Sequence, residues 1–134
     1  AGVQIQLIVR GICCLIPGVP GMSEHIEAIS IVDKFLEHPR VFIFGNEGNP
    51  LVYISSADWM TRNIENRVEV GCPIYDPHVK QELIDTFEIS WSDNVKGRLL
   101  VDTQQSPYRN NGSAPVRSQY ALYEYYQKKL SESN

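Results

Sequence analysis

With 134 residues, 43% of them hydrophobic and 21% charged, the chain has the size and composition of one globular domain, which excludes disorder and fibrous repeats. No apolar run approaches the roughly 20 residues that a membrane-spanning helix needs, so a transmembrane segment is excluded. Cys13, Cys14 and Cys72 are odd in number and two are adjacent, so we expect reduced thiols instead of a disulfide framework. With no CxxC spacing and three scattered histidines, the sequence predicts no metal site.

The charge is unevenly distributed along the chain. The formal net charge of -4 argues at first against a polyanionic partner such as nucleic acid. Residues 76–93, however, contain five acidic side chains and one basic one, which accounts for the whole net charge. Residues 96–129 contain six basic and two acidic side chains, so this part could meet phosphate, although a charge run is most often a solvated face.

The first predicted element is a strand over residues 3–10, where apolar and polar side chains alternate as far as Arg10. Residues 11–21 are rich in glycine and proline, which predicts a loop directly after the strand end. Loops in this position carry ligand groups in open α/β sheets. Because natural amino-termini rarely enter a hydrophobic strand within three residues, we expect a domain truncated at its N-terminus and part of a longer protein.

The apolar spacing that follows favours a helix over residues 29–37, although residues 26–30 suit a short strand equally well. Pro39 ends the helix, because the residue before a proline is pushed out of the helical region. His38 is then expected at the helix C-terminus, where the dipole favours an imidazolium. Taken alone, a histidine in that place is more often a structural cap than a functional group.

Residues 41–45 and 51–55 are rich in β-branched and aromatic side chains, and predict two strands joined as a hairpin. Residues 67–74 predict a further short strand by alternation. Tyr53, Trp59 and Met60 resemble a base-stacking platform, but we expect core packing there.

The second half of the chain predicts two helices separated by a loop. Asp76 can cap a helix with Pro77 at its first position, and apolar side chains keep helical spacing to about Asn94. Residues 102–114 predict a polar loop, and Pro115 is expected to open the last helix.

The three histidines differ in their settings. His25 lies in a polar run and His78 in the first turn of the predicted acidic helix, so both are expected at the surface, which leaves His38 as the candidate for chemistry. The run from His38 to Arg40, followed by Ser55-Ser56-Ala57-Asp58, resembles the HxK and GSxN motifs of the phospholipase D superfamily. Three departures weaken the match: Arg40 replaces lysine, Asp58 replaces asparagine, and glycine stands where the superfamily has aspartate.

A longer set of motifs is more specific. The motifs are LIVRGICCLIPG (7–18), ISIVDKFLEHPRVFIF (29–44), VYISSADWMTRNIENRVEV (52–70), DNVKGRLL (93–100) and VRSQYALYEYY (116–126). In this order and spacing they resemble the C-terminal region of bacterial polyphosphate kinases over nearly the whole chain.

That resemblance implies reversible transfer of the terminal phosphate of ATP to inorganic polyphosphate, with Mg2+ and through a phosphohistidine outside this chain. It implies that Arg10 binds ATP and phosphate, and that His38 is a catalytic, phosphate-binding histidine. Arg40, Arg62 and Arg67 are weaker candidates. The implied partners are ATP or ADP, polyphosphate, the rest of the kinase and further copies of the enzyme, but no nucleic acid.

The expected fold is α/β, a phospholipase D-like mixed β-sheet flanked by helices, with residues 1–134 forming the second such domain of the kinase. The expected location is the cytoplasm, with the periphery of the inner membrane as an alternative, and the isolated chain is expected to be inactive. One alternative function is a phospholipase D-superfamily phosphodiesterase half-site, and another is a non-catalytic module that binds nucleotide or polyphosphate.

Overall fold

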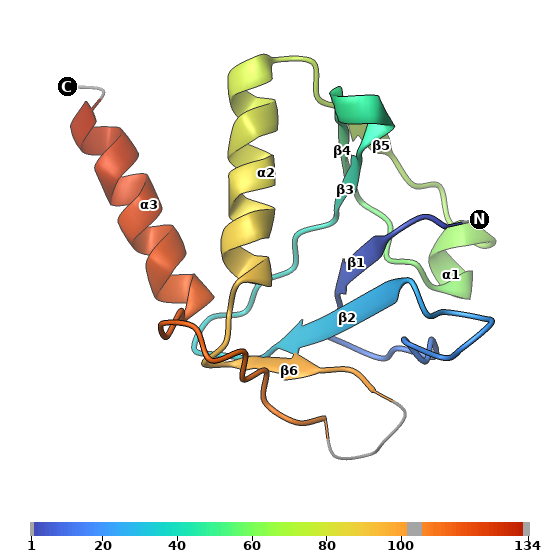
Figure 1. Ribbon diagram of the computed structural model, residues 1–134. Coiled ribbons are helices and arrows are strands. Elements are labelled where there is room, and N and C mark those ends of the chain that lie inside the picture. The colour runs from blue at the N-terminus through green and yellow to red at the C-terminus, as the bar shows by residue number, and fades with distance from the viewer. Residues whose placement is uncertain (1, 102–105, 133–134) are drawn as a thin grey trace. The chain divides into compact units, whose positions relative to one another are not determined.

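The computed structural model describes residues 2–101 and 106–132, which belong to two compact units. The first unit comprises Ala1–Leu36 with Glu88–Asn134, and the second comprises Glu37–Phe87. Each contains a three-stranded sheet, so the chain has the mixed α/β class that the sequence predicts. In chain order, the described elements are β1 (Ile5–Ile8), β2 (Ile26–Ile31), β3 (Val41–Phe44), η1 (Asn46–Gly48), β4 (Leu51–Ser55), α1 (Thr61–Ile64), β5 (Gly71–Pro73), α2 (Pro77–Trp91), β6 (Gly97–Leu99) and α3 (Ser118–Glu132) (Figure 1).

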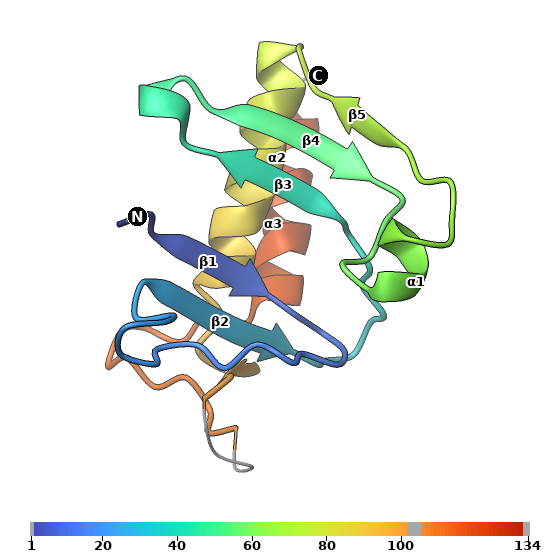
Figure 2. The same cartoon turned by 90° about the vertical axis from the view of Figure 1, so that its right-hand side faces the viewer.

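The sheet of the first unit has the strand order β1-β2-β6. β1 and β2 run parallel and lie side by side in Figure 2, and β6 pairs with β2 in the antiparallel direction. The buried side chains of this sheet come from the central strand, at Ala28, Ile29 and Ile31. The strand predicted over residues 3–10 is confirmed in its centre, whereas β6 was not predicted as a strand.

The helix predicted over residues 29–37 is wrong, because its first residues belong to β2 and the rest form an irregular segment. Isoleucines at both ends of β2 favour extended backbone, and pairing with β1 satisfies the backbone groups of this segment. Phe35 and Leu36, which the helix would have turned to the core, are 58% and 81% exposed. His38 therefore lies in a loop before β3 instead of at the C-terminus of a helix.

Side chains from the start of α3 hold the irregular segment in place. Arg117 forms a two-bonded ion pair with Asp33, with distances of 2.7 Å from Nε to Oδ2 and 2.6 Å from Nη2 to Oδ1. The Gln119 amide accepts a hydrogen bond from the Phe35 N–H and donates one to the Phe35 carbonyl, both at 2.9 Å. These bonds replace the intrahelical hydrogen bonds that the sequence led us to expect.

The second unit contains the predicted hairpin. β3 and β4 pair in the antiparallel direction, with Phe42 opposite Tyr53, and β5 adds to the other edge of β4. β5 occupies only part of the strand predicted over residues 67–74. Proline is tolerated there because β5 is an edge strand of the described sheet. On β4 the Val52 side chain is buried, at 2% exposed, whereas Ile54 on the same face is 41% exposed.

The predicted cap of the acidic helix α2 is confirmed. The Asp76 Oδ1 accepts hydrogen bonds from the N–H groups of Val79, at 3.0 Å, and His78, at 2.9 Å. These bonds, that to Val79 first, lower the pKa of the Asp76 carboxyl from its ordinary value, against a smaller effect of burial. α2 ends at Trp91, three residues before the predicted end.

The last helix begins at Ser118 instead of Pro115. The Ser118 N–H and hydroxyl both donate to the Asp93 Oδ2, at 2.8 and 2.7 Å, so a distant carboxylate defines the helix start. Of the loop predicted over 102–114, residues 102–105 lie outside the described part, and the remainder is irregular. None of the described helices combines the length and apolar character that crossing a bilayer requires.

Candidate functional site

The β3–β4 hairpin brings together the two segments whose sequences resemble the phospholipase D motifs. In its register Val41 lies opposite Ile54, and the Ser55 N–H donates to the Arg40 carbonyl at 2.9 Å. The segment before β3, which carries His38 and Arg40, therefore lies beside the segment that follows β4. The Ser55 hydroxyl accepts a hydrogen bond from the Ala57 N–H at 3.0 Å and so turns the chain after β4.

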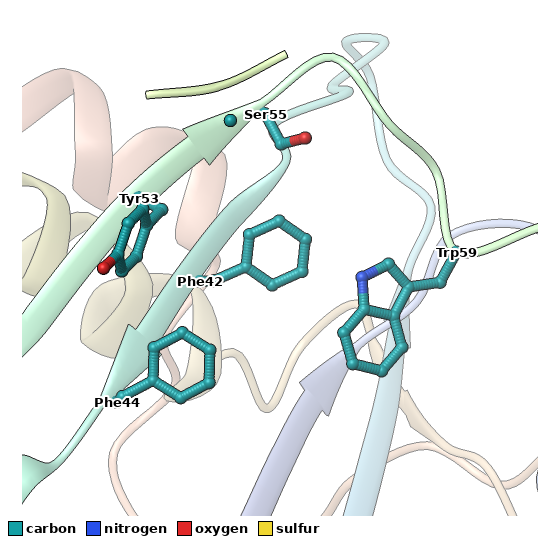
Figure 3. Close-up of a pocket in the computed structure, with 6 residues that line it drawn as sticks. Phe42, Phe44, Tyr53, Ser55 and Trp59 are labelled. Carbon is teal, nitrogen blue, oxygen red and sulfur yellow. The ribbon is translucent and has the colours of Figure 1, made fainter. Parts of the chain in front are cut away.

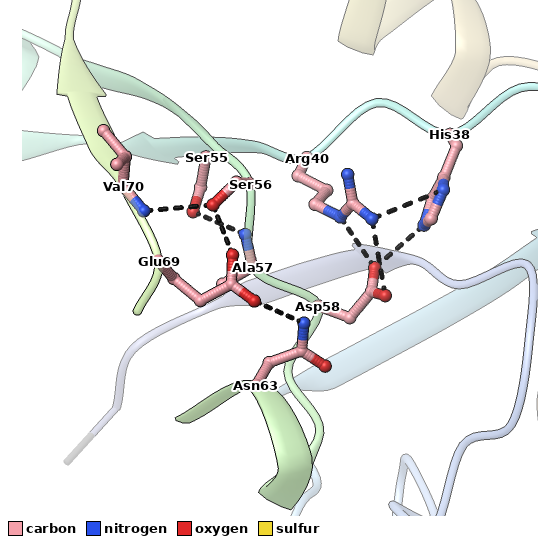
Figure 4. A network of polar contacts seen from close by, with 9 residues as sticks. All are labelled: His38, Arg40, Ser55, Ser56, Ala57, Asp58, Asn63, Glu69 and Val70. Atoms are coloured by element: carbon pink, nitrogen blue, oxygen red, sulfur yellow. Dashed lines mark hydrogen bonds and ion pairs between the residues drawn. The ribbon is translucent and has the colours of Figure 1, made fainter. Parts of the chain in front are cut away.

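His38, Arg40 and Asp58 form one network at this end of the hairpin (Figure 4). The Asp58 Oδ1 lies 2.8 Å from His38 Nε2 and accepts a hydrogen bond from Arg40 Nε, also at 2.8 Å. Arg40 Nη2 lies 3.5 Å from Asp58 Oδ2 and 3.4 Å from His38 Nδ1. The His38 side chain is 53% exposed, against 27% for Arg40 and 25% for Asp58, so the imidazole is the most accessible member.

The network stabilises a charged carboxylate. The hydrogen bond from Arg40, followed by that from His38, lowers the pKa of Asp58 to about 2, although partial burial opposes the change. The same hydrogen bond raises the pKa of Arg40 above its ordinary value. At neutral pH this end of the hairpin therefore holds an ionised carboxylate and a guanidinium in direct contact with the histidine.

A second polar cluster adjoins the first and contains Ser56, Asn63 and Glu69 (Figure 4). The Glu69 carboxylate accepts hydrogen bonds from the Ser56 hydroxyl and, at 2.7 Å, from the Asn63 amide. These bonds, that from Ser56 first, lower the pKa of Glu69. Asn63 is only 2% exposed, and its Oδ1 is buried without a hydrogen-bond partner among the described residues.

Arg10 lies in the first unit, two residues after β1, and is exposed. The Val9 N–H donates to the Ile29 carbonyl at 2.8 Å, which fixes the backbone just before Arg10. The following loop is folded around Ser23, whose hydroxyl donates to the Ile16 carbonyl at 2.6 Å. Arg10 and His38 thus belong to different units.

The other basic candidates are less constrained than Arg40. Arg62 and Arg67 are exposed, and neither forms an ion pair within the described part of the chain. The carboxylate of Glu69, two residues after Arg67, accepts hydrogen bonds from Ser56 and Asn63. His25 and His78 are exposed, as the sequence predicts.

The prediction that Trp59 packs in the core is wrong, because its side chain is 79% exposed. The ring stacks on Phe42, with 5.7 Å between centroids and 24° between planes, and Phe44 meets Tyr53 edge to face at 6.1 Å. These four rings, with Ser55 and Gly71, line a shallow hollow of about 290 Å3 (Figure 3). Tyr53 alternates with buried Val52 and therefore faces this open side of the sheet.

The donors gathered around Asp58 are of the kind that binds phosphate oxygens. A guanidinium and an imidazole supply charge-assisted hydrogen bonds, which are stronger than neutral ones. Within residues 2–101 and 106–132, no group of three or more His, Cys, Asp or Glu side chains is placed to hold a metal ion. Asp58 and Glu69 were missed as site members, although a carboxylate in place of the asparagine of the GSxN motif was a usable signal.

Comparison with known proteins gives a consistent result over nearly the whole chain. A family model described as polyphosphate kinase C-terminal domain 2 matches residues 1–119. Over 126 residues, 93% of the chain, the sequence is 55% identical to a polyphosphate kinase from Vibrio parahaemolyticus and 50% identical to one from Escherichia coli K12. The crystal structure of polyphosphate kinase from Porphyromonas gingivalis matches 98% of the chain at 45% identity, with a TM-score of 0.94.

The matches cover only a small part of each relative. They account for 18% of the Vibrio and Escherichia kinases and 20% of the Porphyromonas chain. The chain therefore spans about a fifth of the length of the relatives it matches.

Proposed function

The chain belongs to the polyphosphate kinase C-terminal domain 2 family, and from this premise we propose that it forms part of the active site of a polyphosphate kinase. The reaction is reversible transfer of the terminal phosphate of ATP to inorganic polyphosphate, through a phosphohistidine supplied by another part of the enzyme. Residues 1–134 are the second phospholipase D-like domain of that enzyme, and ATP or ADP, polyphosphate and the remaining kinase polypeptide are its partners. We further propose that the enzyme is a cytoplasmic homo-oligomer.

The observation that carries this proposal is the exposed imidazole of His38 beside the guanidinium of Arg40. Phosphoryl transfer requires stabilisation of the charge on the transferring oxygens and correct alignment of the reactants. His38 binds a phosphate oxygen and moves a proton to or from it, while Arg40 adds positive charge to the same position. The resemblance to the family supports the same role for His38.

Arg10 is the second phosphate-binding residue of the proposal. Its planar guanidinium can donate two parallel hydrogen bonds to one phosphate, which a lysine cannot reproduce. Its exposure and its place at a strand end, before a loop rich in glycine and proline, support this role. Mg2+ neutralises phosphate charge in such reactions, and we expect other parts of the enzyme to hold it.

The direct test is His38→Ala in the complete kinase that contains this chain, with His78→Ala as the control because His78 is also exposed. We expect His38→Ala to lower polyphosphate synthesis from Mg-ATP by two orders of magnitude or more, since a positioned acid–base group contributes about 100- to 10,000-fold. The thermal midpoint should change little. Near wild-type synthesis by His38→Ala would refute the proposal.

A second assay distinguishes the kinase proposal from the phosphodiesterase alternative. The 134-residue chain alone, incubated with Mg-ATP, should neither make polyphosphate nor acquire an acid-labile phosphate, because groups that act as a unit leave little activity when one is missing. Labelling of His25, His38 or His78 would place the phospho-accepting histidine in this chain. Hydrolysis of a simple phosphodiester would instead support the phosphodiesterase alternative.

A further inference from the structure

The direction of hydrogen bonding in the His38–Arg40–Asp58 network distinguishes the two ring nitrogens of His38. An ionised carboxylate can only accept hydrogen bonds. The low pKa of Asp58, about 2, keeps its carboxyl ionised at neutral pH. The 2.8 Å contact with Asp58 Oδ1 therefore requires a proton on His38 Nε2, whether the imidazole is neutral or charged.

The other nitrogen, Nδ1, does not contact the Asp58 carboxylate. Its described neighbour is Arg40 Nη2 at 3.4 Å, which is long for a hydrogen bond and easily exchanged for another partner. The side chain is 53% exposed, so the ring remains accessible from outside the network.

From this geometry we propose that Asp58 is a positioning residue, which holds the Nε2–H of His38 and leaves Nδ1 as the nitrogen that meets the phosphate oxygen. The inference rests on the proposed role of His38 in the kinase. In the forward proton transfer, the Nδ1–H bond of the imidazolium breaks and an O–H bond forms on the phosphate. The ring is left neutral with its proton on Nε2, and the reverse transfer restores the imidazolium.

Arg40 binds the same carboxylate. Its Nε donates to Asp58 Oδ1 at 2.8 Å, the oxygen that also accepts the hydrogen bond from His38 Nε2. Rotation of the Asp58 carboxylate away from His38 would therefore break the bond to Arg40 as well. The same guanidinium lies near Nδ1, so a phosphate oxygen that reaches Nδ1 can also interact with Arg40.

Two substitutions of His38 in the complete kinase test which nitrogen is used. The amide of asparagine lies close to the position of Nδ1, whereas that of glutamine reaches the position of Nε2. We expect His38→Asn to retain at least tenfold more polyphosphate synthesis than His38→Gln. Equal activity, or more activity with glutamine, overturns the assignment of Nδ1 while the role of His38 stands. Wild-type activity in both variants would remove His38 from the reaction and overturn the proposed function as well.

Substitutions of Asp58 test its positioning role. Asp58→Asn keeps an oxygen that can accept the Nε2 proton, so it should retain about tenfold more synthesis than Asp58→Ala. If the two variants lose activity equally, Asp58 does not act as a hydrogen-bond acceptor for His38.

A spectroscopic measurement on the 134-residue chain supplies an observable that does not depend on activity. In 15N-edited spectra the Nε2–H of His38 should be visible and slow to exchange with solvent, unlike the ring protons of exposed His25 and His78. The signal should disappear in Asp58→Ala while the backbone spectrum is retained. A His38 ring proton that exchanges as fast as those of the other two histidines overturns the proposal.

Discussion

The buried carboxylate of Asp93 is the strongest single determinant of stability that we identify in the first unit. It is 0% exposed, and five donors converge on it. Its Oδ1 accepts hydrogen bonds from the N–H groups of Val95, Lys96 and Gly97, at 3.0, 2.6 and 3.0 Å. Its Oδ2 accepts from the N–H and hydroxyl of Ser118, at 2.8 and 2.7 Å. The carboxylate thus joins the turn before β6 to the start of α3.

Removing the Asp93 carboxylate should lower the free energy of unfolding by several kcal/mol. Burial raises the pKa of Asp93, but the bonds from Ser118 and the turn outweigh it and lower the pKa overall. Asp93→Ala leaves five donors without their acceptor, and some of these donors can bind water instead. We therefore expect the free energy of unfolding to fall by about 3–5 kcal/mol. Asp93→Asn keeps one oxygen for the turn but presents an NH2 group to Ser118, so we expect a loss of about 1.5–3 kcal/mol.

Trp91 provides an intrinsic fluorescence probe for this experiment. Trp91 is 8% exposed and lies in the first unit, whereas Trp59 is 79% exposed in the second. Urea unfolding followed by tryptophan fluorescence in a Trp59→Phe background therefore reports on the unit that contains Asp93. Glu124→Gln is the control, because it also removes one negative charge from the first unit but at an exposed position. It should change the free energy of unfolding by less than about 0.5 kcal/mol.

The pH dependence has a defined sign. Folding lowers the pKa of the Asp93 carboxyl. The carboxylate therefore adds its full share to the free energy of unfolding above the pKa of the unfolded chain, about 3.9, and this share is lost as pH falls through the pKa of the folded chain. The stability difference between the wild-type chain and Asp93→Asn should therefore shrink below about pH 4. A loss below about 1 kcal/mol for Asp93→Ala at pH 7 would refute the reasoning, because it would mean that the five donors find equivalent partners.

Three further predictions concern other positions. Arg10→Lys in the complete kinase should lower polyphosphate synthesis tenfold or more although the charge is kept, because the two-bonded geometry is lost; normal turnover would contradict this. Gly97→Ala should lower the free energy of unfolding by about 1–3 kcal/mol, because an added Cβ would lie 2.3 Å from the Asp93 carbonyl oxygen. An unchanged urea unfolding curve would contradict this prediction. The carboxyl of Asp58 should titrate by NMR near pH 2, and Arg40→Ala should raise that midpoint towards the ordinary value; no change would show that Arg40 is not its main partner.

Matched references control the last two of these measurements. Gly45→Ala is the control for Gly97→Ala, because no atom lies within 4 Å of the Cβ that it would add. In the titration Asp76 is the internal reference, since its carboxyl is held by backbone N–H groups instead of Arg40.

The sequence alone determined the elements whose signals are local. The hairpin of β3 and β4 follows from two β-branched and aromatic runs separated by a glycine-containing turn, and α2 follows from its own cap at Asp76. Such elements contain within a few residues the contacts that define them. The motifs around Arg10 and His38 likewise sufficed to identify the family and to nominate both residues.

Only the tertiary structure decided the features that depend on distant partners. The segment after residue 28 became a strand because β1 and β6 pair with it, and α3 starts at Ser118 because Asp93 binds there. Trp59 is exposed because it packs on the sheet face that carries Phe42, Phe44 and Tyr53, and no described element of the second unit covers this ring. In the same way, Asp58 joins His38 only because the hairpin register brings together side chains 20 residues apart, a pairing that alternation and propensity do not encode.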